Sequence, residues 1–189
     1  MNIVEEIKEF VRSECEKPGS KYGAEPFAYH FAPVVEYAAK LVDELGGDRE
    51  VVLLAAWLHD IGSIIEGRGN HHLSGARIAK QKLQELNYPP EKITQVVKCI
   101  LNHRGSQASE RGNIEEQIIA EADAMSAFDN FAGLFKAALV YEGKTQGEAR
   151  DSVRQKLERK WQQLHFAKSK KIIEPKHKAA MLLLKDKSA

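Results

Sequence analysis

The chain has 189 residues, enough for one domain with a buried core. Hydrophobic residues make up 43% and charged residues 29%, which excludes a chain that is disordered throughout. The net charge of +1 gives no overall attraction to nucleic acid or anionic membranes, and no stretch approaches the ~20 apolar residues of a membrane-spanning helix.

Helical periodicity begins near the N-terminus, where apolar side chains of residues 3–16 recur on one helix face. A second helix is expected over 27–45, because Pro33 lies early in it and Gly46-Gly47 follows it. Asp48 is a natural N-cap for a third helix that runs through residues 51–58. This third helix is apolar nearly all round, which predicts a central, buried position.

The rest of the chain continues as helices separated by Gly, Pro and Asn. Gly62 leads into a loop that contains Gly67, Gly69 and Asn70, and residues 104–113 are polar and predict a surface loop. The remaining expected helices cover residues 73–86, 90–101, 114–141, 145–165 and 175–185. No segment alternates convincingly as a strand, so the fold class is all-α.

These elements predict one compact domain, a helical bundle with three segments: 1–26 as an N-terminal helix and loop, 27–141 as the core, and 142–189 as C-terminal helices that pack on or extend it. The stretch from Lys168 is locally basic, which is more often a solvated helix face than a nucleic-acid site. Cys15 and Cys99 have no paired spacing, which favours a reducing compartment. With acids where a signal peptide needs basic residues, we expect a cytoplasmic protein.

The candidate chemistry centres on His59-Asp60, where the apolar third helix ends. Imidazole nitrogen and carboxylate oxygen suit first-row divalent metals and magnesium. A His-Asp pair alone is more often an ordinary helix end, but two further positions support a metal site. His30 lies near the start of the preceding helix, and Asp123 stands on an otherwise apolar helix face, where an unpaired carboxylate would cost several kcal/mol.

The order His30, His59-Asp60, Asp123 resembles the HD superfamily of metal-dependent phosphohydrolases. The segment LLAAWLHDIG at 53–62 is similar to the family signature, HFAPVVEYA at 30–38 to its first-histidine helix, and EADA at 121–124 to its final aspartate segment. The resemblance covers about residues 27–135. It implies an HD-domain helical bundle in which His30, His59, Asp60 and Asp123 bind a metal, with Asp60 and His59 in catalytic roles.

Two further segments bear on the number of metals. HHLSGA at 71–76 resembles the HxxxGA segment of HD members that bind two metals, and ILNHRG at 100–105 resembles a segment that supplies another histidine. The resemblance implies that Asp60 bridges two ions, with His71 and His103 on the second. One ion with these histidines in supporting roles is left open, as is His72 in place of His71. Mn, Mg, Fe, Co, Ni or Zn would suit such ligands.

The resemblance implies hydrolysis of a phosphate ester or anhydride, with a nucleotide as one candidate. Arg104, beside His103, is the best candidate to bind a phosphoryl group, and Arg68 is a second. Many HD phosphodiesterases carry lysine after the signature glycine, whereas Ser63 stands here, which weakens an assignment to cyclic-dinucleotide hydrolysis. The expected partner is a small phosphorylated molecule, without membrane and with nucleic acid disfavoured, and a homodimer is left open.

Two other classes are retained as hypotheses. A few HD relatives use the same His and Asp ligands to hold two irons and activate oxygen on small organic substrates. The HD core can also serve as a ligand-binding or partner-binding module without catalysis, usually after loss of metal ligands, and all four ligands are present here. The phosphohydrolase therefore remains the leading hypothesis.

Overall fold

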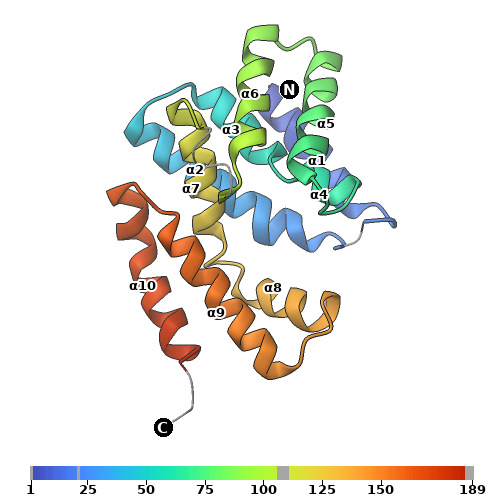
Figure 1. The fold of residues 1–189 in the computed structure, drawn as a ribbon. Coiled ribbons are helices and arrows are strands. Elements are labelled where there is room, and N and C mark those ends of the chain that lie inside the picture. The colour runs from blue at the N-terminus through green and yellow to red at the C-terminus, as the bar shows by residue number, and fades with distance from the viewer. Residues whose placement is uncertain (1, 21, 106–110, 186–189) are drawn as a thin grey trace. The chain divides into compact units, whose positions relative to one another are not determined.

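A computed structural model describes residues 2–20, 22–105 and 111–185 of the chain (Figure 1). These residues form helices and connecting turns with no strand, so the predicted all-α class is confirmed. None of the helices within these ranges is long and apolar enough to cross a membrane. The elements are α1 (Ile3–Glu16), η1 (Phe27–Phe31), α2 (Ala32–Leu45), α3 (Arg49–Leu58), α4 (Ile61–Ile65), α5 (His71–Glu85), α6 (Pro90–Asn102), α7 (Ile114–Ser126), α8 (Phe131–Lys136), η3 (Ala137–Tyr141), α9 (Gln146–Gln162) and α10 (Ala167–Leu183).

Backbone contacts group the chain into two compact units, Met1–Asp123 and Ala124–Ala189, which are described separately. The three segments expected from the sequence, 1–26, 27–141 and 142–189, remain predictions. The boundary between the units lies within α7, directly after the candidate ligand Asp123. The whole candidate site therefore belongs to the first unit.

The first unit is built around α3, as its apolar sequence predicts. All residues from Val51 to Leu58 are buried, and α3 contacts α1, α2 and α6. The side chain of Asp48 caps this helix by accepting hydrogen bonds from the backbone N–H groups of Glu50 and Val51. Helices α5 and α6 lie side by side along their length (Figure 1). His59 and Asp60 directly follow the end of this buried helix.

Four helix boundaries differ from the sequence predictions. Residues 61–65 form a short helix, α4, where a loop was expected, because Ile61 and Ile64 continue the buried core. Helix α5 begins at His71 rather than at residue 73, after Asn70 adopts a left-handed conformation (φ 52°). His71 and His72 therefore stand in the first turn of a helix, which gives their side chains defined directions.

The other two differences concern the C-terminal half. The expected helix over 114–141 is interrupted after Ser126 by a turn in which Phe128 and Asp129 donate backbone hydrogen bonds three residues back. Helix α10 starts at Ala167 instead of near residue 175, and Pro175 lies inside it. A proline costs one helical hydrogen bond, but buried residues on both sides, including Ile173, hold the two parts of α10 in place. The expected loop at 104–113 lies partly outside the described residues, at 106–110.

The second unit contains α8, η3, α9 and α10, and α9 contacts each of the other three. A capping box starts α9: the Thr145 side chain accepts from the backbone of Glu148, whose carboxylate accepts from the Thr145 backbone. Between α9 and α10, the ring of His177 stacks on Trp161 with centroids 4.5 Å apart and contacts the Glu158 carboxylate at 2.8 Å. The locally basic stretch from Lys168 lies mainly within α10, whose Ile173 and Ala180 are buried.

Candidate metal centre

His59 and Asp60 form the junction between α3 and α4. Asp60 has φ −113° and ψ 13°, close to the sparsely populated bridge region between helical and extended backbone, where many active-site residues occur. The fully buried His59 ring has its Nδ1 2.8 Å from the carbonyl oxygen of Ala56. A carbonyl only accepts, so Nδ1 carries the proton and the Nε2 lone pair of His59 is available to a metal.

The first group of candidate ligands surrounds this Nε2 atom. The Nε2 atoms of His30 and His59 are 3.0 Å apart, and His30 Nε2 is 3.3 Å from Asp60 Oδ2. Asp123 Oδ1 lies 4.0 Å from His30 Nε2 and 3.9 Å from His59 Nε2. Two nitrogens that bind one ion at ~2.0–2.1 Å are themselves roughly 3 Å apart, so the spacing of the histidines fits shared metal ligation.

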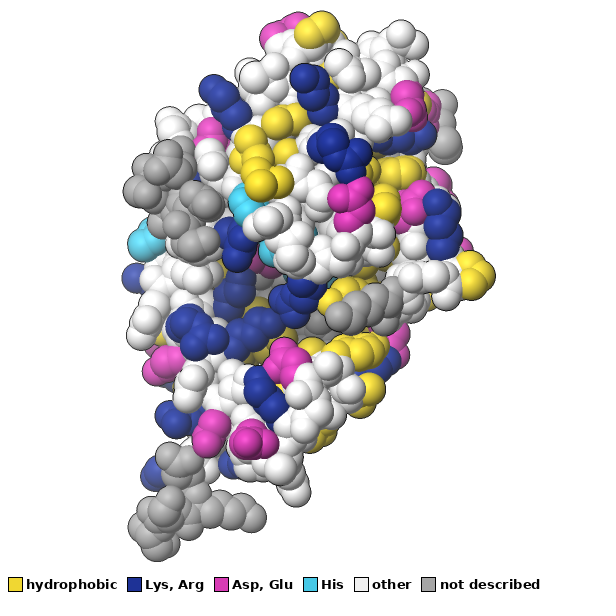
Figure 2. All heavy atoms as spheres, turned by 45° about the vertical axis from the view of Figure 1, so that its right-hand side comes forward, with side chains coloured by type: hydrophobic (Ala, Val, Ile, Leu, Met, Phe, Trp, Pro, Cys, Tyr) yellow, Lys and Arg dark blue, Asp and Glu magenta, His cyan; other side chains and the backbone are white. Residues whose placement is uncertain are grey.

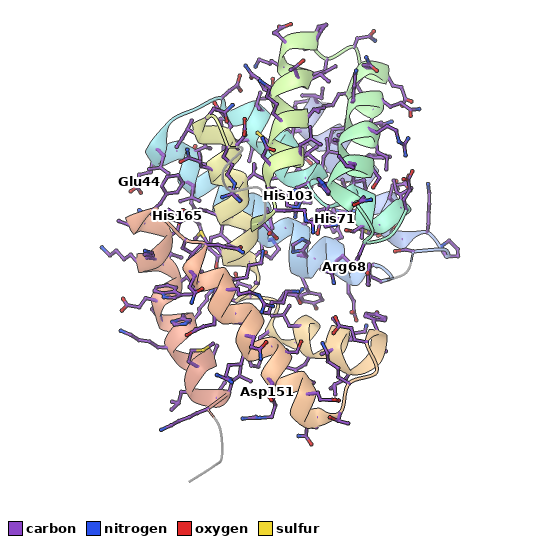
Figure 3. The ribbon with its side chains drawn as sticks, in the orientation of Figure 1. Glu44, Arg68, His71, His103, Asp151 and His165 are labelled. Carbon is purple, nitrogen blue, oxygen red and sulfur yellow. The ribbon has the colours of Figure 1, made fainter. Side chains whose placement is uncertain are left out.

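A second group lies on the other oxygen of Asp60. His71 Nε2 is 3.2 Å and His103 Nε2 is 3.6 Å from Asp60 Oδ1, and the side chains of His71 and His103 are drawn close together in Figure 3. Each ring turns its Nδ1 to a backbone carbonyl, of Arg68 at 3.0 Å and of Ile100 at 2.6 Å. Asp60 Oδ1 is buried and makes no hydrogen bond of good geometry. An acceptor in this state fits a bound cation.

Asp60 is thus the common member of two possible metal-binding groups. The candidate ligand atoms of His30, His59 and Asp60, and likewise those of Asp60, His71 and His103, lie within 4.8 Å of one another. The two oxygens of Asp60 face the two groups separately. The residues that the sequence singled out are therefore brought together, although they come from η1, the α3–α4 junction, α5, the end of α6, and α7.

Burial and nearby charges shift the pKa values of His59 and His103 in opposite directions. Burial lowers the pKa of His59 to about 4, so its ring is neutral at physiological pH. Burial also acts to lower the pKa of His103, but the adjacent Asp60 carboxylate outweighs it and raises that pKa. Burial would raise the pKa of Asp60, but the imidazoles of His103 and His30 hold it well below its usual range. Asp60 is therefore an anion ready to bind a cation.

These opposite shifts predict that the two groups lose metal at different pH values. A base with a depressed pKa stays neutral as pH falls, whereas one with a raised pKa takes up a proton earlier and then competes with metal. Metal affinity is expected to weaken as pH drops through ~6.5, first in the group that contains His103. Equilibrium dialysis at pH 8 and pH 6 measures this. An affinity that is flat between ~pH 5 and 8 would contradict it.

The other candidates lie beside the second group. His72 does not face Asp60 in any contact of the described residues, and its Nδ1 is 3.2 Å from Arg104 Nη1. Burial and the neighbouring Arg104 charge lower the pKa of His72. Arg68 is exposed and contributes its backbone carbonyl to His71, while the role of its side chain as a substrate contact remains a prediction. Histidine side chains reach the surface next to hydrophobic and basic side chains in Figure 2.

Sequence reasoning missed the residues that support His103. Arg111 donates to the backbone carbonyls of Asn102 at 3.0 Å and of Arg104 at 2.9 Å, and thereby ties down the end of α6. The buried Glu116 accepts from the Asn102 side chain at 2.8 Å. Glu116 could have been found from the Asn-x-x-Glu pattern of a helix start at Asn113, whereas nothing distinguished Arg111 from a surface arginine.

Gly62 allows α4 to approach α5 closely enough to place His71. A Cβ atom at Gly62 would lie 2.3 Å from the His71 carbonyl oxygen and 2.6 Å from the Gly75 backbone nitrogen. The first turn of α5 can therefore pack here only against a glycine. The glycines of the two segments, HDIG and HHLSGA, meet at this contact.

Gly62→Ala is expected to force α5 away, which costs about 1–3 kcal/mol of stability and weakens metal binding selectively at the group that contains His71. Thermal melts and metal titration measure both effects. Gly147→Ala is the matched control, because Gly147 also lies in a helix but has nothing within 4 Å of its added Cβ. Unchanged metal affinity in Gly62→Ala would contradict this packing argument.

Comparisons with known proteins add three findings. The family model described as the HD domain matches residues 27–128. Ribonuclease Y of Rubrobacter xylanophilus is 36% identical over 110 residues, which cover 57% of this chain and 19% of that protein. A tRNA (cytidine(56)-2'-O)-methyltransferase of Picrophilus torridus is 28% identical over 134 residues, 64% of this chain and 37% of that protein. The chain thus spans well under half the length of these relatives.

A solved structure has the same fold over nearly the full length. It is an HD-superfamily hydrolase from Bacillus thuringiensis, which superposes with a TM-score of 0.73 and covers 96% of this chain and 92% of its own, at 21% identity. At this identity the likeness shows the fold alone. The predicted helical bundle is therefore confirmed.

Proposed function

Because this chain belongs to the HD domain family, we propose that it is a metal-dependent phosphohydrolase that acts on a phosphate ester or anhydride. The observation that carries the proposal is the position of Asp60, whose two oxygens face two separate groups of imidazole nitrogens. A carboxylate with imidazole nitrogens near each of its oxygens suits a pair of divalent ions. The 36% identity with a protein named ribonuclease Y supports phosphoester chemistry, but the shared segment is 19% of that protein.

We assign one ion to His30, His59, Asp60 and Asp123 and a second to Asp60, His71 and His103. The candidate metals remain Mn, Mg, Fe, Co, Ni and Zn. A bound divalent metal would polarise a phosphoryl oxygen and lower the pKa of bound water toward ~7. The backbone carbonyls that accept from Nδ1 of His59, His71 and His103 orient each Nε2 lone pair toward the centre.

The charges around the centre suit an anionic substrate. Arg104 directly follows His103, its backbone carbonyl accepts a hydrogen bond from Arg111, and its guanidinium contacts His72, the neighbour of His71. Arg104, with Arg68 as a second contact, would bind phosphoryl oxygens and offset charge that develops on them. The net charge of +1 gives no general attraction for nucleic acid, so we propose a small phosphorylated molecule as the substrate.

Elemental analysis of protein purified without chelator, followed by a panel of phosphate esters and nucleotides with the metal found, tests this proposal. We expect a divalent metal and phosphate release. Iron in the protein together with oxygen consumption and no phosphate release would instead support the oxygenase alternative. Metal without turnover on any class of substrate would favour a binding module.

A further inference from the structure

The two histidines of the second group are each followed in sequence by a polar residue, and these two residues contact each other. His72 follows His71 at the start of α5, and Arg104 follows His103 after the end of α6. Arg104 Nη1 lies 3.2 Å from His72 Nδ1. Each partner of this contact thus directly follows one of the second pair of candidate ligands, His71 and His103.

The direction of this hydrogen bond determines which ring nitrogen of His72 carries the proton. An arginine side chain only donates, so Nδ1 of His72 accepts and the ring proton is on Nε2. His72 therefore offers an N–H donor on the edge of the ring opposite to Arg104. It cannot at the same time turn Nδ1 to a backbone carbonyl, as His59, His71 and His103 do. This contrast separates His72 from the candidate ligands.

Arg104 is held in a position to act with His72. The carbonyl oxygens of His103 and Arg104 accept hydrogen bonds from Arg111 Nη2 at 3.4 Å and 2.9 Å. These bonds restrain the backbone of Arg104. A guanidinium carries five N–H donors in a planar fork, and one directed at His72 leaves the fork able to bind a further acceptor. His72 on α5 and Arg104 after the end of α6 can therefore contact different oxygens of one phosphate group.

Phosphate monoesters and diesters differ in the number of free phosphate oxygens and in charge, and His72 and Arg104 could distinguish them on this basis. The phosphate of a diester has two non-bridging oxygens and a single negative charge. The terminal phosphate of a monoester has a third, and it carries more negative charge. Donors outside the metal ligands can bind this additional oxygen and charge, and His72 and Arg104, which follow His71 and His103 in sequence, provide two such donors.

We propose that His72 and Arg104 form an anion subsite that binds a terminal phosphate and makes the centre selective for phosphate monoesters over diesters. This inference rests on the proposed phosphohydrolase function and narrows its substrate class. His72 acts in it as a substrate-binding residue and not as a metal ligand.

The test compares unmutated protein, Arg104→Gln, His72→Ala and His72→Gln, each loaded with metal. Binding of inorganic phosphate is measured by calorimetry, and kcat and KM are measured for p-nitrophenyl phosphate and bis(p-nitrophenyl) phosphate. Arg104→Gln and His72→Ala are expected to weaken phosphate binding roughly 10- to 100-fold and to raise KM for the monoester more than for the diester. His72→Gln, whose amide can present an N–H at the same reach, should recover part of the loss.

Arg77→Gln is the matched control, because Arg77 lies on α5 as well but pairs with Glu66 at the surface. Metal equivalents and helicity are measured for every variant and should not change. Loss of a metal equivalent in His72→Ala, equal effects on both esters, or the same effect in Arg77→Gln would overturn the subsite. If the unmutated protein hydrolyses neither ester, the proposed function fails on that measurement, while phosphate calorimetry still decides the subsite: normal affinity in Arg104→Gln overturns it.

Discussion

Asp60→Ala is expected to remove both metal ions and to lower turnover by more than ~100-fold, since even residues that only orient metal ligands cost 10- to 100-fold. The reason is that each oxygen of Asp60 faces a different group of imidazoles. His59→Ala should be less severe, because it removes a ligand from the first group alone. Metal content by elemental analysis, with turnover and circular dichroism on the same samples, measures these effects.

Asp43→Ala serves as the control for loss of an aspartate. Asp43 is exposed and pairs with Arg49 at the surface, so this variant should keep its metal and its turnover. Helical content should survive in Asp60→Ala, because Asp60 lies at the junction between α3 and α4 and not within either helix. Full metal content and turnover in Asp60→Ala would refute the central assignment.

His71→Ala and His103→Ala are each expected to reduce bound metal from two equivalents toward one. The ion held by His30, His59, Asp60 and Asp123 should stay tight, because these variants leave its ligands intact. Titration with metal at saturation, followed by elemental analysis after desalting, gives the stoichiometry.

The neighbouring His72→Ala is the matched control and should keep both equivalents, because the His72 ring contacts Arg104 and not Asp60. A firm value of one equivalent in the unmutated protein, without a weaker second site, would defeat the two-metal assignment. If His72→Ala lost an ion and His71→Ala did not, two ions would stand and the assignment of His71 would be wrong.

The helix boundaries show where local sequence is insufficient. The N-cap at Asp48, Pro90 at the start of α6 and Gly46 after α2 are all visible in the sequence, because each acts on neighbouring backbone. The short helix α4 was missed because a five-residue helix has little stability alone and forms here against α1 and α5. The last helix was expected only from residue 175, whereas α10 begins at Ala167 and buries Ile173 before Pro175.

For the site, the sequence by itself determined which residues have metal-binding chemistry, because imidazoles and carboxylates stand at helix ends and on an apolar face where few other roles suit them. It could not determine how Asp60 divides its two oxygens, nor that His71 and not His72 faces them. Only the tertiary structure decided these points, since they depend on the close approach of α4 to α5 at Gly62 and on the end of α6 held by Arg111. Distances between atoms on different helices arise from packing, and no local pattern encodes them.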